Sequence, residues 1–286
     1  MQESQLRSIL RNELRIVKGD IVCVHSALGF LNLDLDAKAV LQVLLETVGP
    51  SGTLIFPTYP GASYEFLSSN QVFDVRATSS AKSTGLLTDL AWQHPSALRS
   101  LHPTKSMAGI GPMSQTLLGT HQQCPFPYDY LSPYYKLSEH GAKIIGLGVW
   151  TYNLSFVHTV DDTMKEHFPF CPHAPQLFKS RCLDGQGIEQ TIYSYAHDLK
   201  RMSYDTLHVQ DFMKSHVAKE ITDDFAVEDR RFFRVDAKKL YARMCELAED
   251  GITIFKRAQG RTDAEKEREL WLKLKDQVKD TGVNID

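Results

Sequence analysis

Cysteine is scarce in this sequence, and the cysteines present form no recognisable pattern. The 286 residues contain five cysteines, an odd number, at widely separated positions and without a Cys-x-x-Cys pair. A disulfide framework or a cysteine-based zinc site is therefore not expected. Cys171 and His173 are a close Cys/His pair, but such a pair alone is a weak sign of a metal site, so we expect no metal.

Long apolar runs and a strong excess of one charge are also missing. No run approaches the roughly 20 residues that cross a bilayer, and the N-terminal residues Met1–Arg7 lack the apolar core of a signal peptide. A cytoplasmic location is the default expectation. The net charge is −3, so we expect neither nucleic acid nor a membrane as a partner.

What is present is an ordinary globular composition. Apolar residues make up 42% and charged residues 23% of the chain, and its length suits one large domain. No internal repeat or sharp composition shift divides it. We predict a single domain over residues 1–260, followed by a helical tail over 261–286 whose charged amphipathic helix covers 262–277.

The first part of the chain has the pattern of an α/β protein. A buried strand over 20–25 leads through a loop to Asp36, which can cap a helix over 37–47. A turn at Gly49–Gly52 then opens a second strand over 53–56. Short links of this kind are typical of parallel α/β architecture, so we predict a largely parallel central sheet.

The rest of the chain alternates helical and strand patterns. Residues 58–83 are irregular and polar, and a segment of that length after a strand tends to be functional. Prolines, glycines and alternating patches over 167–195 predict a small antiparallel β excursion. We expect helices over 84–94, 114–120, 205–216 and 237–248, a helix capped by Ser132 with Pro133 at its first position, and strands over 143–150, within 225–235 and over 252–256.

The most informative stretch is Ser155–Asp162, directly after the strand over 143–150. His158 and Asp161 are three residues apart and so share one face of a helical turn. The carboxylate can hold the imidazole in one tautomer and raise its basicity, which favours a general base. Asp162 offers a second carboxylate, and the choice between the two acids stays open. With 11 histidines in the chain, a chance pairing is the alternative.

Four motifs, in their order and spacing, resemble the aminoglycoside 3-N-acetyltransferase family, also called the antibiotic acetyltransferase fold. They are Val24-His-Ser-Ala-Leu28, Gly49-Pro-Ser-Gly-Thr-Leu-Ile-Phe-Pro-Thr58, Arg99-Ser-Leu-His-Pro-Thr-Lys-Ser106 and Ser155-Phe-Val-His-Thr-Val-Asp161. The resemblance spans residues 5–260 and implies a three-layer α/β/α core. It also implies acetyl transfer from acetyl-CoA to an amine. His158 falls on the family's base, and Asp161 falls on its acidic partner, where the family usually carries glutamate.

Acetyl-CoA is therefore the expected cosubstrate, with no metal. The loop after the first strand and the polar motif further along the chain offer backbone N–H groups, hydroxyls and a cation for it. A local structural role is the alternative for His25, Ser26 and His102. The expected coenzyme-binding residues are His25, Ser26, Ala27, Leu28, His102, Thr104, Lys105 and Ser106.

The acceptor site is expected to contain acidic and aromatic residues. Several carboxylates would favour a cationic amine, although each acid alone is more often a solvated loop residue. The expected acceptor-binding residues are Tyr64, Glu65, Asp74 and Asp129. Two departures from the family bear on this region: Lys105 replaces the second histidine of a family motif, and residues 168–175 replace an aromatic segment.

We therefore expect an N-acetyltransferase whose small-molecule partner is an amino sugar. An aminoglycoside and a nucleotide-linked amino sugar for surface polysaccharide compete as acceptors, and a homodimer is left open. A hydrolase that uses Ser155 or Ser26 with His158 is an alternative, disfavoured because the chain lacks a Gly-x-Ser-x-Gly elbow. A non-catalytic CoA-binding protein on the same fold is the other alternative.

Overall fold

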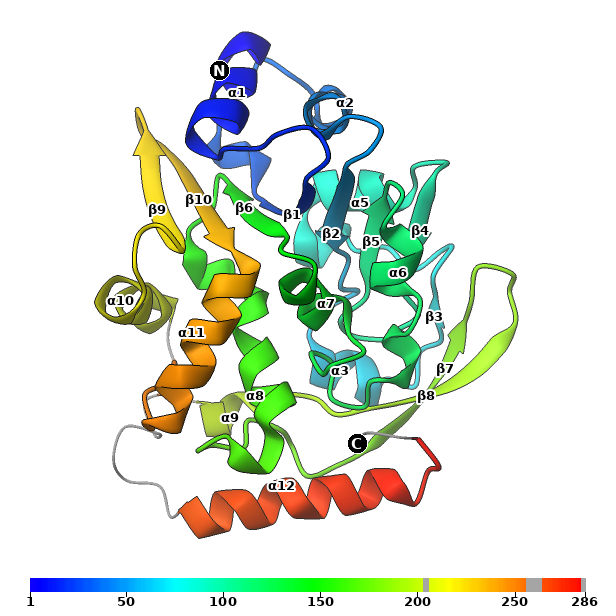
Figure 1. Ribbon diagram of the computed structural model, residues 1–286. Helices are drawn as coiled ribbons and strands as arrows, with labels where there is room; N and C mark the ends of the chain where they lie inside the picture. Colours follow the sequence, from blue (N-terminus) through cyan, green and yellow to red (C-terminus); the bar gives the residue numbers. More distant parts are fainter. Residues whose placement is uncertain (203–205, 256–263, 284–286) are drawn as a thin grey trace.

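The computed structural model describes residues 1–202, 206–255 and 264–283. Its main feature is a sheet of seven strands in the order β4-β5-β2-β1-β6-β10-β9 (Figure 1). The strands are β1 Ile21–Ser26, β2 Thr53–Pro57, β4 Ala97–Arg99, β5 Met107–Ile110, β6 Lys143–Leu147, β9 Thr222–Val227 and β10 Arg230–Asp236.

The prediction of a largely parallel sheet is wrong, and the fold is mixed α/β. β1 runs parallel to β2 and β6, whereas every other neighbouring pair in this sheet is antiparallel. The prediction extended the first strand–helix–strand unit to the whole sheet. β9 and β10 instead form a hairpin with a very short link, and such a link allows only antiparallel pairing.

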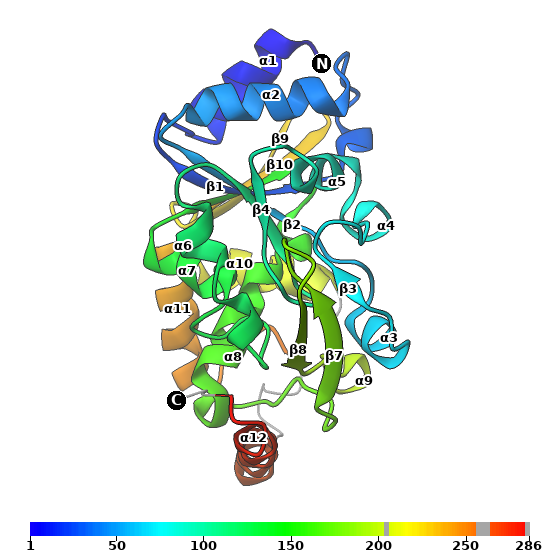
Figure 2. The same cartoon turned by 90° about the vertical axis from the view of Figure 1, so that its right-hand side faces the viewer.

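Helices cover both faces of this sheet, as the three-layer expectation requires. Along β1, Val22 and Val24 belong to one apolar core and Cys23 to the other, because successive strand residues face opposite sides. Figure 2 shows α1 and α2 stacked on one side. The first core is covered by α1 Glu3–Ser8, the π-helical turn Ile9–Glu13, α2 Ala37–Val48 and α5 Leu86–Trp92. The second is covered by α6 Ser114–Leu118, α7 Pro133–Glu139, α8 Thr159–Met164, α10 Thr206–His216 and α11 Ala237–Glu249.

Both predicted helix caps are confirmed. The side chain of Asp36 accepts a hydrogen bond from the Ala39 N–H at 2.8 Å at the start of α2. The Ser132 hydroxyl accepts one from the Tyr135 N–H at 3.2 Å, with Pro133 at the first position of α7. Each cap satisfies a backbone donor that the first helical turn leaves unpaired.

A second, three-stranded sheet lies beside the main one. The hairpin of β7 Phe178–Leu183 and β8 Glu189–Ser194 confirms the predicted β excursion. β3 Phe73–Asp74 adds to it in parallel with β7. Residues 58–83 are therefore less irregular than expected, because α3 Ser63–Ser68, β3 and α4 Ala81–Thr84 form within them.

The remaining differences concern element limits. Residues 252–255 form no strand, and Ile254 and Phe255 pack in a core instead; Lys256, the last residue of that predicted strand, lies outside the described residues. The predicted strand over 143–150 ends at Leu147. The other described elements are α9 Leu199–Met202 and the 3-10 turns Leu28–Phe30, His121–Gln123, Thr151–Asn153, Ser155–His158 and Lys165–His167.

The C-terminal helix α12 Ala264–Lys279 packs at the opposite end of the molecule from α1 (Figures 1 and 2). Trp271, Leu274 and Val278 on α12 join a buried cluster with Phe126 and Tyr195. The domain limit at residue 260 stays a prediction, but α12 is integrated into the packing. Within the described ranges, no helix has both the length and the apolarity of a membrane span.

Candidate active site

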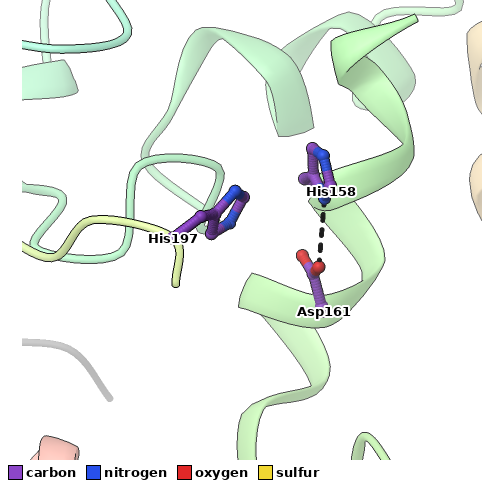
Figure 3. Close-up of side chains that lie close together, drawn as sticks. All are labelled: His158, Asp161 and His197. Atoms are coloured by element: carbon purple, nitrogen blue, oxygen red, sulfur yellow. Dashed lines mark hydrogen bonds and ion pairs between the residues drawn. The ribbon is translucent and has the colours of Figure 1, made fainter. Parts of the chain in front are cut away.

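His158 and Asp161 lie side by side, as their spacing predicts (Figure 3). His158 ends a 3-10 turn that continues directly into α8, so the two side chains lie on the same turn. Nδ1 of His158 is 3.2 Å from Oδ2 of Asp161, and the other carboxylate oxygen accepts the Asp162 N–H at 3.0 Å. Of the two acids left open by the sequence, Asp161 is the one that contacts His158.

Asp162 forms a second imidazole–carboxylate pair. Its Oδ1 lies 2.6 Å from Nε2 of His173, and its Oδ2 accepts the Tyr128 N–H at 2.8 Å. His197 lies between the two pairs, with its ring centroid 4.5 Å from that of His158 and 4.9 Å from that of His173. His197 was missed in the sequence because it follows β8 without any local motif.

Two groups of side chains in this cluster have metal-ligand geometry. In each group the potential ligand atoms lie within 4.8 Å of one another. Each carboxylate also contacts an imidazole as a hydrogen-bonded pair, whereas Nε2 of His197 and Nδ1 of His173 have no hydrogen-bond partner among the described residues. The absence of a metal stays a prediction. The groups are His158, Asp161 and His197, and Asp162, His173 and His197.

Burial controls the protonation of these groups. It lowers the pKa of His158 to about 3, and the positive charge of Lys105 contributes in the same direction. The expectation that the paired acid raises the basicity of this imidazole is therefore wrong, because burial outweighs it. Burial, with the neighbouring charge of Asp162, raises the pKa of Asp161 well above its usual range. His158 is therefore neutral near pH 7 and has a nitrogen lone pair to accept a proton.

A cavity of about 400 Å³ opens where β1 and β2 end. These strands are parallel, so their carboxyl ends meet at one edge of the sheet, the usual ligand position in α/β proteins. A second cavity of about 210 Å³ contains His158 and shares Asn153 and Ser155 with the first. The large cavity is lined by Val24, His25, Ser26, Ala27, Pro57, Tyr59, Ala81, Lys82, Ser83, Thr84, Gly85, Thr88, Val149, Asn153 and Ser155.

Three of the eight residues expected to bind the coenzyme line the large cavity: His25, Ser26 and Ala27. His25 is buried, which lowers the pKa of its imidazole to about 4, and its Nε2 has no hydrogen-bond partner among the described residues. Leu28 does not line the cavity and instead packs against the core under α2.

The residues of the predicted motif over 102–106 do not line this cavity. His102 is fully buried and stacks on His121 with ring centroids 4.3 Å apart. Thr104 is also fully buried, and the Ser106 hydroxyl donates to the Thr58 carbonyl at 2.7 Å. These residues hold the turn that leads into β5. Lys105 differs from them, because its side chain reaches the ring of Tyr59.

The four residues expected to bind the acceptor do not converge. Tyr64 is half exposed on α3 and packs against Phe178, and Glu65 beside it is exposed. Asp74 is paired with Arg76 at 2.9 Å. Asp129 is buried and paired with Lys165 at 3.0 Å, and burial raises the pKa of its carboxyl to about 6. No cluster of unpaired acids forms from this set.

Tyr59 connects the large cavity to the His158 region, although the sequence did not single it out. It lines the large cavity, and its hydroxyl contacts that of Tyr134. Burial raises the pKa of the phenol to about 12, while hydrogen bonding by Ser155 opposes that rise. Its position two residues after β2 was the available signal, because side chains at such strand ends point into a ligand site.

Comparison with known proteins places the chain in a family. Residues 23–249 match the family model of aminoglycoside 3-N-acetyltransferases. The chain belongs to this family. It is 26% identical over 137 residues to aminoglycoside N(3)-acetyltransferase IV of Salmonella, an alignment that covers 48% of this chain and 49% of that protein. It is 27% identical over 158 residues to an aminoglycoside N(3)-acetyltransferase III of Serratia marcescens, covering 51% and 58%.

The chain thus spans about half the length of the curated relatives it matches. Solved structures of the family share the fold over a larger part. Aminoglycoside acetyltransferase AAC(3)-Xa superposes with a TM-score of 0.74 at 21% identity, over 88% of this chain and 94% of that one. AAC-IIIb, in a binary complex with CoASH, superposes with a TM-score of 0.72 at 20% identity, over 88% and 98%.

Proposed function

We propose that this family member is an acetyl-CoA-dependent N-acetyltransferase that acts on the amine of an amino sugar, with His158 as the general base. The observation that carries the proposal is the buried, neutral imidazole of His158, which contacts Asp161. This imidazole lines the smaller cavity, which shares Asn153 and Ser155 with the large cavity. Family membership supplies the reaction class.

The chemistry follows from the hydrogen bond to Asp161. In the tautomer with the proton on Nδ1, this N–H donates a hydrogen bond to the Asp161 carboxylate, and Nε2 keeps the lone pair. The acceptor nitrogen attacks the thioester carbonyl and becomes positively charged, so its proton becomes acidic enough for a base of lowered pKa. Asp161 stabilises the imidazolium as it forms, as in other carboxylate–histidine pairs. The C–S bond breaks, and the proton on His158 is available to the leaving thiolate.

The large cavity is our proposed position for acetyl-CoA. The ends of β1 and β2 supply the Ser26 hydroxyl and backbone groups, and the segment before α5 supplies Lys82 and Ser83. Because Asn153 and Ser155 line both cavities, a thioester at this shared wall is near the cavity that contains His158. The CoASH complex of AAC-IIIb, which has the same fold, supports a coenzyme site in this fold.

Two acceptors fit the proposal. The names of the relatives favour an aminoglycoside. A nucleotide-linked amino sugar is favoured by a specific observation, namely that Asp74 and Asp129 are already neutralised by Arg76 and Lys165. A polycationic antibiotic would require carboxylates that remain available to it.

The proposed function is tested by incubating the purified protein with acetyl-CoA and a panel of aminoglycosides, amino sugars and nucleotide-linked amino sugars, and measuring released thiol. His158→Gln is expected to lower kcat by about 10²–10⁴. His140→Gln, on an exposed histidine, is the matched control and should leave it unchanged. Full turnover by His158→Gln would exclude the assigned base. Ester hydrolysis without CoA would indicate the hydrolase alternative, and CoA binding without turnover the non-catalytic one.

A further inference from the structure

The ammonium group of Lys105 has no polar partner among the residues that the structure describes. Its Nζ lies over the ring of Tyr59, 4.6 Å from the centroid, and 5.9 Å from that of Tyr128. It forms no hydrogen bond or ion pair within the described ranges. Aromatic faces attract a cation, but they do not accept its N–H groups as oxygen atoms do.

Other shielded lysines of this protein do have such partners. Lys165 is paired with Asp129 at 3.0 Å, and Lys143 with Asp20 at 2.7 Å. Lys136 donates to the Thr116 carbonyl at 2.8 Å. Removing an ammonium from water is unfavourable unless it is paired. A shielded lysine without a polar partner is therefore unusual. Taken as a whole residue, Lys105 is partly exposed, and it lines neither of the two cavities.

The carboxylate that attracts the charge of Lys105, Asp162, is already engaged, because it contacts His173 and the Tyr128 N–H. The adjacent Asp161 contacts His158. The ring of Tyr128 lies between Lys105 and the proposed base, with its centroid 5.9 Å from Nζ of Lys105 and 5.4 Å from the ring centroid of His158. An additional anion at this position would satisfy the lysine without breaking any of these contacts.

We propose that Lys105 binds an anionic group of the acceptor, a phosphate or a carboxylate, so that the acceptor is an acidic amino sugar and not a polycationic antibiotic. This inference rests on the proposed function, because it takes His158 as the point where the acceptor amine reacts. The phosphates of CoA do not fit this position, since the pantetheine arm separates them from the sulfur. The ammonium contributes charge-assisted hydrogen bonds to the acceptor oxygens.

The test is a binding titration of the CoA-saturated protein, which needs no turnover. D-glucosamine, which has the amine but no anionic group, is the reference. Glucosamine 6-phosphate and uridine diphosphate are the phosphate probes, and muramic acid is the carboxylate probe. We expect at least one anionic probe to bind about 10- to 100-fold more tightly than glucosamine. Comparing the phosphate and carboxylate probes identifies which anion the site selects.

Variants assign that preference to Lys105. Lys105→Met should remove the 10- to 100-fold preference, and Lys105→Arg, which keeps the charge, should retain most of it. Lys18→Met, at an exposed lysine, is the matched control and should bind like the unmodified protein. Circular dichroism checks that each variant is folded, and Lys105→Gln replaces Lys105→Met if that variant does not fold.

Two results would overturn the proposal: no preference for any anionic probe in the unmodified protein, or an unchanged preference in a folded Lys105→Met variant. If Lys105→Met does not fold, a preference lost in folded Lys105→Gln supports the proposal, and one that persists there overturns it. Absence of acetyl transfer to every amine would instead reject the proposed function, while the binding result would still show whether Lys105 holds an anion.

Discussion

Asp161 contacts Nδ1 of His158 at 3.2 Å, whereas the adjacent Asp162 contacts His173 at 2.6 Å. Asp161→Asn should therefore lower kcat by at least about 100-fold, because an amide cannot stabilise the imidazolium. Asp161→Glu, which restores the family's usual residue, should recover part of the rate. Steady-state kinetics with each variant measures the effect. An Asp161→Asn enzyme with an unchanged kcat would show that the contact has no catalytic role.

The pH dependence of the reaction should reflect the lowered pKa of His158. Burial is the main cause, Lys105 and His173 act in the same direction, and Asp162 opposes them. As the pH falls, a base is lost when it becomes protonated, so a pKa of about 3 keeps His158 active throughout the range from pH 8 to 5. Over that range kcat/KM should fall with protonation of the acceptor amine, and protonation of His158 should not contribute to that fall.

Removing the charge of Lys105 should move this pKa. In Lys105→Met the imidazolium of His158 is no longer repelled, so its pKa should rise. The resonance of the His158 ring, identified from its loss in His158→Gln, reports the change in an NMR titration. A His158 resonance that titrates near pH 6.5 in the unmodified protein would contradict the lowered pKa.

The parts of the fold that could be predicted from the sequence depend on local patterns. α2 has its Asp36 cap and an apolar stripe, and β1 and β2 flank it over short links. Strand partners depend on contacts between distant residues. β5 pairs antiparallel with β2, whose paired residues lie 50 to 56 positions earlier, and no local pattern specifies that choice. The error about parallel strands arose from this difference.

The same distinction applies to the site. His158 and Asp161 are three residues apart, so one helical turn suffices to predict their contact. His197 comes to them from the loop after β8, and tertiary packing alone brings it there. From the sequence, Asp129 is a candidate to bind the acceptor, but in the structure it is paired with Lys165, 36 residues later in the chain. Acidic residues in a loop indicate a cation site only when their partners are known.

Gly148 lies close to Ala27, in the loop after β1 that we propose to bind the coenzyme. Its φ is +77°, and a Cβ added there would lie 2.4 Å from the carbonyl oxygen of Ala27. Gly148→Ala should lower the free energy of unfolding by about 1–3 kcal/mol through backbone strain. It should also raise the KM for acetyl-CoA, because Ala27 lines the large cavity. Gly29→Ala is the control, since its Cβ would meet nothing within 4 Å. Equal stability and KM in the two variants would contradict this account.

The helix α12 should stabilise the His173 end of the site as well as the fold. Trp271 is fully buried, with its ring centroid 5.4 Å from both Phe126 and His173. Its indole N–H donates to the Phe170 carbonyl at 3.3 Å. Trp271→Ala removes this packing and should lower the free energy of unfolding by about 3–5 kcal/mol in urea titrations.

The neighbouring Leu272 provides a matched comparison on the same helix, because its side chain is 41% exposed. Leu272→Ala should change the free energy of unfolding by no more than about 0.5 kcal/mol. If α12 were only an appended tail, both variants would unfold at the same urea concentration as the unmodified protein. A loss of stability confined to Trp271→Ala would instead make α12 part of the cooperative domain, because its buried face closes the cluster behind His173 and Asp162.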